Sequence, residues 1–291
     1  MQALFFYATY PIIYLVALLP FRLLYKFSDF LYYILRISGY RKEVVIANLR
    51  NSFPDKSDRE IEILCEQYFR YLCDLILETF KTLLMTEKEA RERCVFANTT
   101  WLNDLYEKKR SIIIVMGHYG NWEWAGPAFS LCTNYQLVVI YRPLSNPYFE
   151  SMMTRMRTKF GTRITPVNLT LRKMVEYKND VTATAFIADQ TASKRDAYWT
   201  LFLNQDTAAF TGPEKLAIKF DYPVVYMSVR RVRRGYYAIT PELLFEEPKS
   251  TGDGEITQAF TERLEREIKL DPPFWLWSHK RWKHKRENTP G

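Results

Sequence analysis

His118 and Glu123 are the two residues whose types and spacing are best suited to chemistry. They lie in the segment 111–124, which opens with a run of β-branched residues. Such a run predicts a buried strand. Gly120 and Asn121 then allow a sharp turn and offer a helix N-cap. A base and a carboxylate at a strand-to-helix turn occupy a place where α/β proteins commonly keep their functional groups.

The spacing of this pair limits how the two side chains can meet. On one continuous helix, residues five apart point about 140° away from each other. His118 must therefore lie on the loop and Glu123 in the first helical turn. Glu123 can then accept a hydrogen bond from one ring nitrogen of His118 and leave the other nitrogen free as a base. The alternative is structural: a histidine satisfied at a strand end, and a glutamate favoured by the helix dipole.

No serine or cysteine in this segment forms a nucleophile elbow, the strained strand-to-helix turn that exposes a catalytic side chain. A base that lacks a nucleophile of its own suits the deprotonation of a hydroxyl group on a substrate. Backbone N–H groups near Gly120 and Asn121, at the start of the helix, are candidates to stabilise a developing oxyanion.

Length and composition favour a globular protein that works beside an anionic partner. The chain has 291 residues, of which 47% are hydrophobic, enough for one large domain or two modest ones. Aromatic residues reach 16%, which suits contact with a lipid interface. The formal net charge of +8 favours nucleic acid or anionic lipid as a partner.

The cysteine and histidine counts argue against disulfides and metal centres. The four cysteines show neither a CxxC motif nor metal-ligand spacing. Cys65 and Cys73 would lie about 12 Å apart along a helix, too far for a disulfide. All four are expected to be buried thiols in a reducing compartment. With only three histidines in the chain, we expect no metal and no cofactor.

The N-terminal segment predicts membrane attachment. Residues 1–21 carry no charge, and the apolar stretch Ala3–Leu19 has the minimum length for crossing a bilayer. No basic region precedes it and no small-residue cleavage site follows, which argues against a cleaved signal peptide. The first basic residues, beginning with Arg22, follow this stretch, so the positive-inside rule places the body of the protein in the cytoplasm. The helix can span the membrane or lie in its plane.

The remaining pattern predicts an α/β fold. A capping box, Ser57–Glu60, begins a long helix. Strands are expected over 111–117, 136–142, 181–188, 224–232 and 236–240, with helices over 122–132, 147–160, 169–178 and 213–220. We therefore expect a mixed, mostly parallel central sheet flanked by helices. It is preceded by the N-terminal membrane helix and a helical segment, giving a division into residues 1–95 and 96–291. Residues 287–291 are expected to form a frayed tail.

Three clusters of basic residues stand out. The stretch 151–173 holds six Lys or Arg and no acid, and further clusters fall at 230–234 and 279–286. Each can be a solvated face, but together they favour an anionic partner. Trp275, Trp277 and Trp282, in or near the third cluster, add interfacial character. The apolar N-terminus makes lipid a better partner than nucleic acid, and we expect no nucleic acid.

Five blocks, in order along the chain, carry a resemblance to a known family. They are His118-Tyr-Gly-Asn-Trp-Glu123, Tyr141-Arg-Pro-Leu-Ser-Asn-Pro147, Ala188-Asp-Gln190, Phe210-Thr-Gly-Pro-Glu-Lys-Leu-Ala217 and Pro273-Phe-Trp-Leu-Trp-Ser-His-Lys-Arg281. Together with the apolar N-terminus, they resemble the late acyltransferases of lipid A biosynthesis, of the lauroyl/myristoyl type. The stretches 194–197 and 203–206 are more polar than that family's third block, so the donor-chain length and the acceptor remain open.

The resemblance implies an acyltransferase at the cytoplasmic side of the inner membrane. The donor would be a thioester of acyl carrier protein, and the acceptor a hydroxyl group of a lipid A precursor. In this scheme His118 is the general base and Glu123 orients it. The candidate substrate-binding residues are Asn121, Arg142, Asp189, Gln190 and Gly212. The alternatives are another lipid acceptor, such as a lysophospholipid or aminolipid, thioester hydrolysis, or a non-catalytic protein that binds anionic lipid.

Three of these residues can also have a purely structural role. Arg142 suits a phosphate because a guanidinium can make two parallel hydrogen bonds to it, but it can equally be a surface arginine at a strand end. Asp189 and Gln190 follow a predicted strand, where they can line a site or simply cap a turn.

Overall fold

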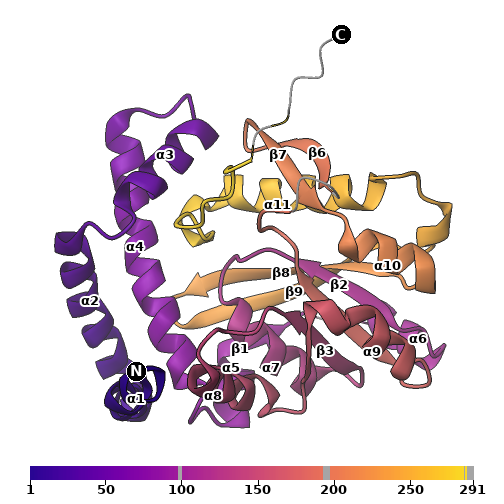
Figure 1. Cartoon of the computed structure of the whole chain (residues 1–291), viewed down its shortest axis with the longest axis horizontal. Helices are drawn as coiled ribbons and strands as arrows, with labels where there is room; N and C mark the ends of the chain where they lie inside the picture. The colour runs from indigo at the N-terminus through magenta and orange to yellow at the C-terminus, as the bar shows by residue number, and fades with distance from the viewer. Residues whose placement is uncertain (98–99, 193–196, 285, 287–291) are drawn as a thin grey trace.

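The centre of the computed structural model, which describes residues 1–97, 100–192, 197–284 and 286, is a seven-stranded sheet. Its strand order is β1-β9-β8-β2-β5-β3-β4 (Figure 1). Only the β8–β9 pair is antiparallel, so β1 and β9 run against the other five strands. The bounds are β1 Cys94–Phe96, β2 Ile112–Met116, β3 Gln136–Tyr141, β4 Arg163–Pro166, β5 Thr182–Ile187, β8 Val224–Arg233 and β9 Tyr236–Phe245. The expected mixed, mostly parallel sheet is confirmed.

The central strand β2 is buried on both faces, which explains its unbroken apolar run. Ile112 and Ile114 face a cluster that includes α7, whereas Ile113 and Val115 face a cluster that includes α11. Figure 1 shows α10 and α11 on one side of the sheet and α5 and α7 on the other. The helices of this core are α5 Glu87–Arg93, α6 Thr100–Glu107, α7 Trp122–Cys132, α8 Pro147–Thr158, α9 Thr170–Glu176, α10 Gly212–Phe220 and α11 Glu255–Leu270.

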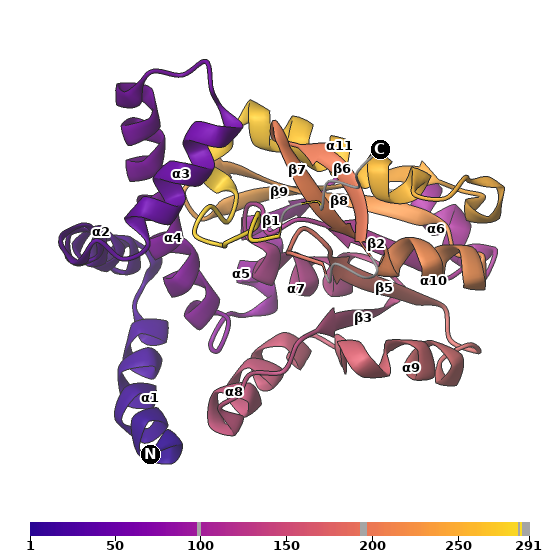
Figure 2. The same cartoon turned by 45° about the horizontal axis from the view of Figure 1, so that its top comes forward.

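Four helices precede this core: α1 Gln2–Leu18, α2 Phe21–Ser38, α3 Lys42–Ser52 and α4 Asp58–Lys81. The predicted capping box at the start of α4 is confirmed, with Ser57 and Glu60 each bonding the other's backbone amide. Figure 2 shows α1 extending away from the sheet beside α8, and an apolar cluster joins these two helices. Within the described part of the chain, no helix has both the length and the apolarity needed to cross a membrane. The proposed boundary between residues 95 and 96 falls inside β1.

A two-stranded hairpin, β6 Ala197–Phe202 and β7 Gln205–Phe210, was not expected from the sequence. Its turn residues Leu203 and Asn204 adopt positive φ angles of 50° and 62°, so the polar stretch 203–206 is the two-residue hairpin turn and the start of β7. Of the other polar stretch, 194–197, only Ala197 lies within the described residues.

The chain after α11 turns back towards the end of β2 through a short 3-10 helix, Pro272–Phe274. The interfacial role expected for Trp275 and Trp277 is wrong, because these side chains are only 2% and 0% exposed. The predicted tail 287–291 lies outside the described residues. The four cysteines are free thiols, but Cys132 is exposed rather than buried.

Candidate active site

A cavity of about 620 Å³ lies between α7 and the sheet and reaches the segments that follow β2, β3 and β5. These strands are parallel, so their carboxyl ends meet at one edge, the usual place for a ligand in an open α/β sheet. Part of the wall is apolar and comes from the strands and α7: Ile114, Met116, Ala125, Gly126, Phe129, Leu137, Val139 and Ala185. Charged and imidazole groups also line it: His118, Glu123, Arg142, Arg157, His279 and Lys283.

His118 stands directly beyond β2 and is held by Asp189, which stands beyond β5. Its Nδ1 lies 2.6 Å from one Asp189 carboxylate oxygen, and its backbone N–H donates to the other at 2.8 Å. With Asp189 ionised, Nδ1 carries the ring proton and Nε2 is left as the basic nitrogen. Nε2 lies 3.4 Å from the side-chain nitrogen of Gln190, and both residues line the cavity. The ring also packs edge-to-face on Trp122, at 4.9 Å between centroids.

Asp189 is a buried carboxylate whose surroundings favour the ionised form. It accepts a third hydrogen bond from Nε1 of Trp275 at 2.8 Å. Burial alone would raise the pKa of Asp189, but the charge and hydrogen bonds of His118 and the bond from Trp275 lower it to about 2. Asp189 therefore does what a triad's acid does for its histidine: it fixes the tautomer and balances the charge of an imidazolium.

Glu123 is engaged elsewhere, which corrects the expectation that it hydrogen-bonds to His118. Its two carboxylate oxygens accept from Nε and Nη2 of Arg157, at 3.0 and 2.6 Å. Burial alone would lower the pKa of Arg157, but Glu123 raises it, so this guanidinium stays charged. Both side chains line the cavity beside His118. Glu123 is thus brought to the expected site, but as the partner of an arginine.

The turn between β2 and α7 is fixed by its backbone. Gly120 has a φ of +60°, and a Cβ added there would lie 1.9 Å from the carbonyl oxygen of Val229. Its N–H donates to the carbonyl of Phe274 at 3.0 Å. The prediction that this amide stabilises an oxyanion therefore does not hold, because the amide is already bonded. The N–H groups of Trp122 and Glu123 have no acceptor within the helix, because they belong to its first turn.

The other predicted binding residues divide into two groups. Arg142 and Gln190 line the cavity, as expected for groups that touch a substrate. Asn121 does not line it: its side chain is fully buried and caps α7 by accepting from Trp124 N at 3.0 Å. Gly212 does not line it either. It begins α10, and a Cβ there would lie 2.2 Å from the ring of Phe210. Both residues therefore have structural roles at the starts of α7 and α10, and their part in substrate binding stays a prediction.

Two partners in the site were not identified from the sequence. Arg157 belonged to a basic stretch read as a possible solvated face, yet it follows the buried pair Met152 and Met156 on α8. That apolar spacing is the signal that could have placed Arg157 near the core. Trp275 had been assigned to a lipid interface, and no local pattern connects it with Asp189, which lies 86 positions away.

These groups can abstract a proton from a hydroxyl group held beside an apolar chain. The Nε2 of His118 can accept the proton, the apolar wall can accommodate hydrocarbon, and Arg142 and Lys283 offer positive charge in the same cavity. Among the described residues, no three His, Cys, Asp or Glu side chains are grouped so that they could hold a metal ion.

Comparison with known proteins gives consistent matches over most of the chain. The family model described as bacterial lipid A biosynthesis acyltransferase matches residues 2–284. A lipid A biosynthesis palmitoleoyltransferase of Escherichia coli K12 is 24% identical over 248 residues, covering 84% of this chain and 79% of that protein. A lipid A biosynthesis lauroyltransferase of the same organism is 23% identical over 287 residues, covering 96% and 91%. A lipid A biosynthesis acyltransferase of Haemophilus influenzae is 20% identical over 261 residues, covering 88% and 82%.

Proposed function

Because the chain belongs to the bacterial lipid A biosynthesis acyltransferase family, we propose that it moves a fatty acyl chain from an acyl-carrier-protein thioester to a hydroxyl group of a lipid A precursor. The supporting observation is the His118–Asp189 pair beside a cavity with an apolar wall. A positioned base and a hydrocarbon-lined cavity are the two things that this transfer requires of the protein.

His118 acts as the general base. Its Nε2 takes the proton of the acceptor hydroxyl while that oxygen attacks the thioester carbonyl. The tetrahedral intermediate collapses by breaking the carbon–sulfur bond, and the imidazolium returns the proton to the leaving thiolate. The products are an ester and a free carrier thiol. Asp189 holds the ring in the productive tautomer and stabilises its charged form during the step.

The developing oxyanion is stabilised from the start of α7. The amides of Trp122 and Glu123 occupy the first helical turn, where the helix dipole also favours negative charge. The ion pair between Arg157 and Glu123 lies at the same end of the cavity and keeps a cation beside the reacting carbonyl. The acyl chain then extends along the apolar wall towards Phe129, where each buried methylene contributes about 0.8 kcal/mol to binding.

The acceptor is held by its phosphate groups. Arg142 offers a planar guanidinium suited to bidentate phosphate contact, and Lys283 adds a second cation to the same cavity. Gln190 contacts the reacting hydroxyl from the side of His118 Nε2.

The enzyme works on the cytoplasmic side of the inner membrane, with α1 and α2 lying in the lipid interface. These helices expose large apolar side chains: Leu4, Phe5, Ile12 and Leu15 on α1, and Leu23, Phe30, Ile34 and Ile37 on α2. An apolar face of this kind adsorbs to a bilayer without crossing it, and nearby basic residues favour anionic lipid.

The test is a transfer assay with a matched pair of histidine variants. Purified protein is incubated with acyl-carrier-protein thioesters and a tetra-acylated lipid A precursor, and the products are identified by mass spectrometry. His118→Ala should lose about 10²- to 10⁴-fold of the rate, the usual contribution of a general base. His284→Ala, a histidine that does not line the cavity, controls for the substitution itself.

Activity of His118→Ala within tenfold of the wild type would contradict the base assignment. Transfer to a lysophospholipid or an aminolipid, but not to the lipid A precursor, would identify a different acceptor. Release of free fatty acid at an equal rate with and without acceptor would identify a thioester hydrolase, and binding to anionic vesicles without any turnover would identify a lipid-binding protein.

A further inference from the structure

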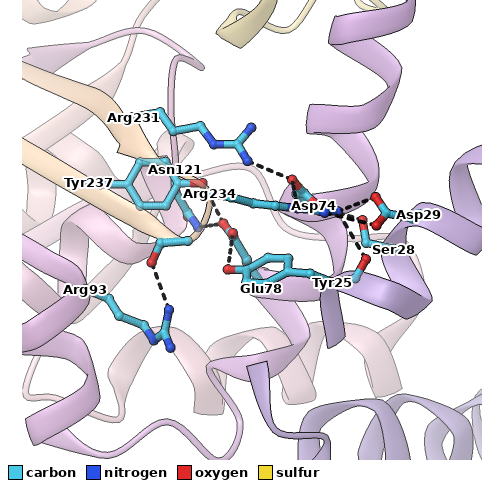
Figure 3. Close-up of polar contacts among 11 residues, drawn as sticks. Tyr25, Ser28, Asp29, Asp74, Glu78, Arg93, Asn121, Arg231, Arg234 and Tyr237 are labelled. Carbon is cyan, nitrogen blue, oxygen red and sulfur yellow. Dashed lines mark hydrogen bonds and ion pairs between the residues drawn. The ribbon is translucent and has the colours of Figure 1, made fainter. Parts of the chain in front are cut away.

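Glu78 on α4 is a buried acid outside the cavity that the reaction scheme does not use. It is completely buried, and three donors converge on its carboxylate (Figure 3). Tyr25 donates to one oxygen at 2.8 Å, while Tyr237 and the side-chain nitrogen of Asn121 donate to the other, each at 2.7 Å. Within the described residues no basic side chain forms an ion pair with it. Buried carboxylates without a cation are uncommon, because removing the charge from water is costly.

The free-energy cost of burying this charge shows in the pKa of the carboxyl group. Burial raises the pKa of Glu78 to about 7, even though the hydrogen bonds from its neighbours lower it. An apolar side chain of similar size would often serve the stability of a helix interface as well or better. The retention of an acid here therefore favours a role in fixing a geometry.

The geometry that Glu78 fixes is that of the turn before α7. The Asn121 amide has two jobs: its oxygen accepts from Trp124 N at 3.0 Å and caps the helix, and its nitrogen donates to Glu78. The main-chain carbonyl of Glu78 also accepts from Trp124 Nε1 at 3.0 Å. One turn of α4 thus holds both the first turn of α7 and its cap, and the cap lies between His118 and Glu123 in the chain.

A second residue on the same face of α4 strengthens this attachment. Tyr71 lies two helical turns before Glu78, and its hydroxyl donates to the carbonyl of Gly120 at 2.5 Å. The same carboxylate also bonds α2 and β9, through Tyr25 and Tyr237 (Figure 3). Glu78 is therefore the point where the N-terminal helices, the sheet and the turn that carries the base are joined.

We propose that Glu78 is a positioning residue for the acyl transfer and acts through its hydrogen bond to Asn121. The bond sets the start of α7, and with it the first-turn amides of Trp122 and Glu123 relative to His118. This inference rests on the proposed function for its kinetic consequence, but the restraint on the turn is a property of the folded protein alone. It can therefore be measured whether or not the right substrates are supplied.

The first measurement is hydrogen exchange of the amides of residues 119–125 in the full-length protein. Glu78→Met and Asn121→Ser each break the bond: methionine has a similar length but no oxygen to accept from Asn121, and serine keeps the helix cap because its hydroxyl is a good N-cap acceptor. Both variants should exchange these amides at least about tenfold faster, since local opening becomes easier. Tyr25→Phe is the matched control: it removes one donor from the same carboxylate but leaves the bond to Asn121, and its exchange in the turn should match the wild type.

The second measurement is the kinetics of transfer in the assay described above. A displacement of about 1 Å in a reacting geometry can cost about 100-fold. We expect kcat to fall by about 10- to 100-fold in Glu78→Met and in Asn121→Ser, with KM for the acyl donor within threefold of the wild type. The double variant should be no slower than the slower single variant, because both changes break one interaction.

Three outcomes overturn the proposal: unchanged exchange in the turn of both single variants, kcat of both within threefold of the wild type, or additive losses in the double variant. If Glu78→Met does not fold, Asn121→Ser alone decides, because it breaks the same bond from the other side. The two hypotheses can also be separated. If the wild-type protein shows no transfer activity but both variants exchange the turn amides faster than it does, the proposed reaction is refuted and the restraint on the turn stands.

Discussion

Replacing Asp189 with asparagine tests the central feature of the site, the carboxylate behind the histidine. The substitution keeps the size of the side chain but removes the charge that three donors now share. The asparagine amide can direct its NH₂ group at Nδ1 of His118, and this nitrogen must then accept. The proton moves to Nε2, the atom that has to act as the base, and the ring is held in the wrong tautomer.

The size of the loss can be built from two contributions. The lowering of the Asp189 pKa from 3.8 to about 2 corresponds to about 2 kcal/mol in favour of the charged pair, or about thirtyfold in rate if the forming imidazolium loses it. The wrong tautomer accounts for the rest of the loss, because the same substitution in a serine-protease triad costs about 10⁴-fold in total. We expect kcat for Asp189→Asn to fall by about 10³- to 10⁴-fold.

The assay pairs the transfer rate with nitrogen NMR of the histidine rings. The chain has only three histidines, so the signal of His118 can be assigned by its absence in His118→Ala. The wild type should show the tautomer protonated at Nδ1, and Asp189→Asn should show a shift towards protonation at Nε2. Glu123→Gln serves as the comparison, because it disturbs the ion pair with Arg157 and should leave the tautomer unchanged.

The reasoning is refuted if Asp189→Asn transfers acyl chains within tenfold of the wild type. It is also refuted if Glu123→Gln, and not Asp189→Asn, changes the tautomer of His118, since that result would return the orienting role to the carboxylate predicted from the sequence.

Three further predictions concern the cavity, the turn and the buried acid of α4. Gly126→Leu should fill part of the cavity, since a Cβ there meets only Leu137 at 3.8 Å. We expect kcat/KM for the longest accepted donor to fall at least about tenfold relative to donors about four carbons shorter, at about 0.8 kcal/mol per displaced methylene; an unchanged chain-length profile would place the acyl chain elsewhere. Gly120→Ala should lower the free energy of unfolding by about 3 kcal/mol or more, because the new Cβ meets the backbone of Val229 at a positive φ. Gly161→Ala, also at a positive φ but with open space around it, should cost only about 1 kcal/mol, and equal losses in chemical denaturation would show that the contact with Val229 does not matter. Glu78 has a folded-state pKa of about 7 against an ordinary value of 4.5. The folded protein therefore binds the proton more tightly, and stability present below pH 4.5 should be lost as the pH rises to 7, by about 3 kcal/mol in total. Unfolding measured across this range should show that slope in the wild type and not in Glu78→Gln; parallel curves would contradict the assignment.

The parts of the fold that could be predicted are those whose signal is local. The strands β2, β3, β5 and β8 are apolar runs bounded by turns, and each was found close to its observed position. β1 and β4 have three and four residues, too short for any pattern to identify. The hairpin β6–β7 escaped prediction because its exposed and half-buried residues mix polar and apolar types, and its partners are α11 and the C-terminal segment.

The position of the site could be predicted from the sequence, but the carboxylate that pairs with His118 could not. The base at 118 follows from a histidine at the exit of a buried strand, and the cavity indeed lies there. The choice of Glu123 as its partner used proximity in sequence, whereas the sheet order puts β5 beside β2 and so brings Asp189 to the ring. Glu123 was then free to pair with Arg157 of α8. Strand order decides which carboxylate pairs with His118, and strand order cannot be predicted from any single segment of the sequence.

The contacts of Phe274 and Trp275 have a consequence for biosynthesis. Phe274 receives the N–H of Gly120, and Trp275 bonds both Asp189 and, through a bridge, Tyr119. During synthesis, His118 and Asp189 are therefore added to the chain long before Phe274 and Trp275, the residues that hold them in place. Catalytic competence should arrive only after residues 274 and 275 have been added, and a product truncated after residue 270 should be inert even if its sheet has formed.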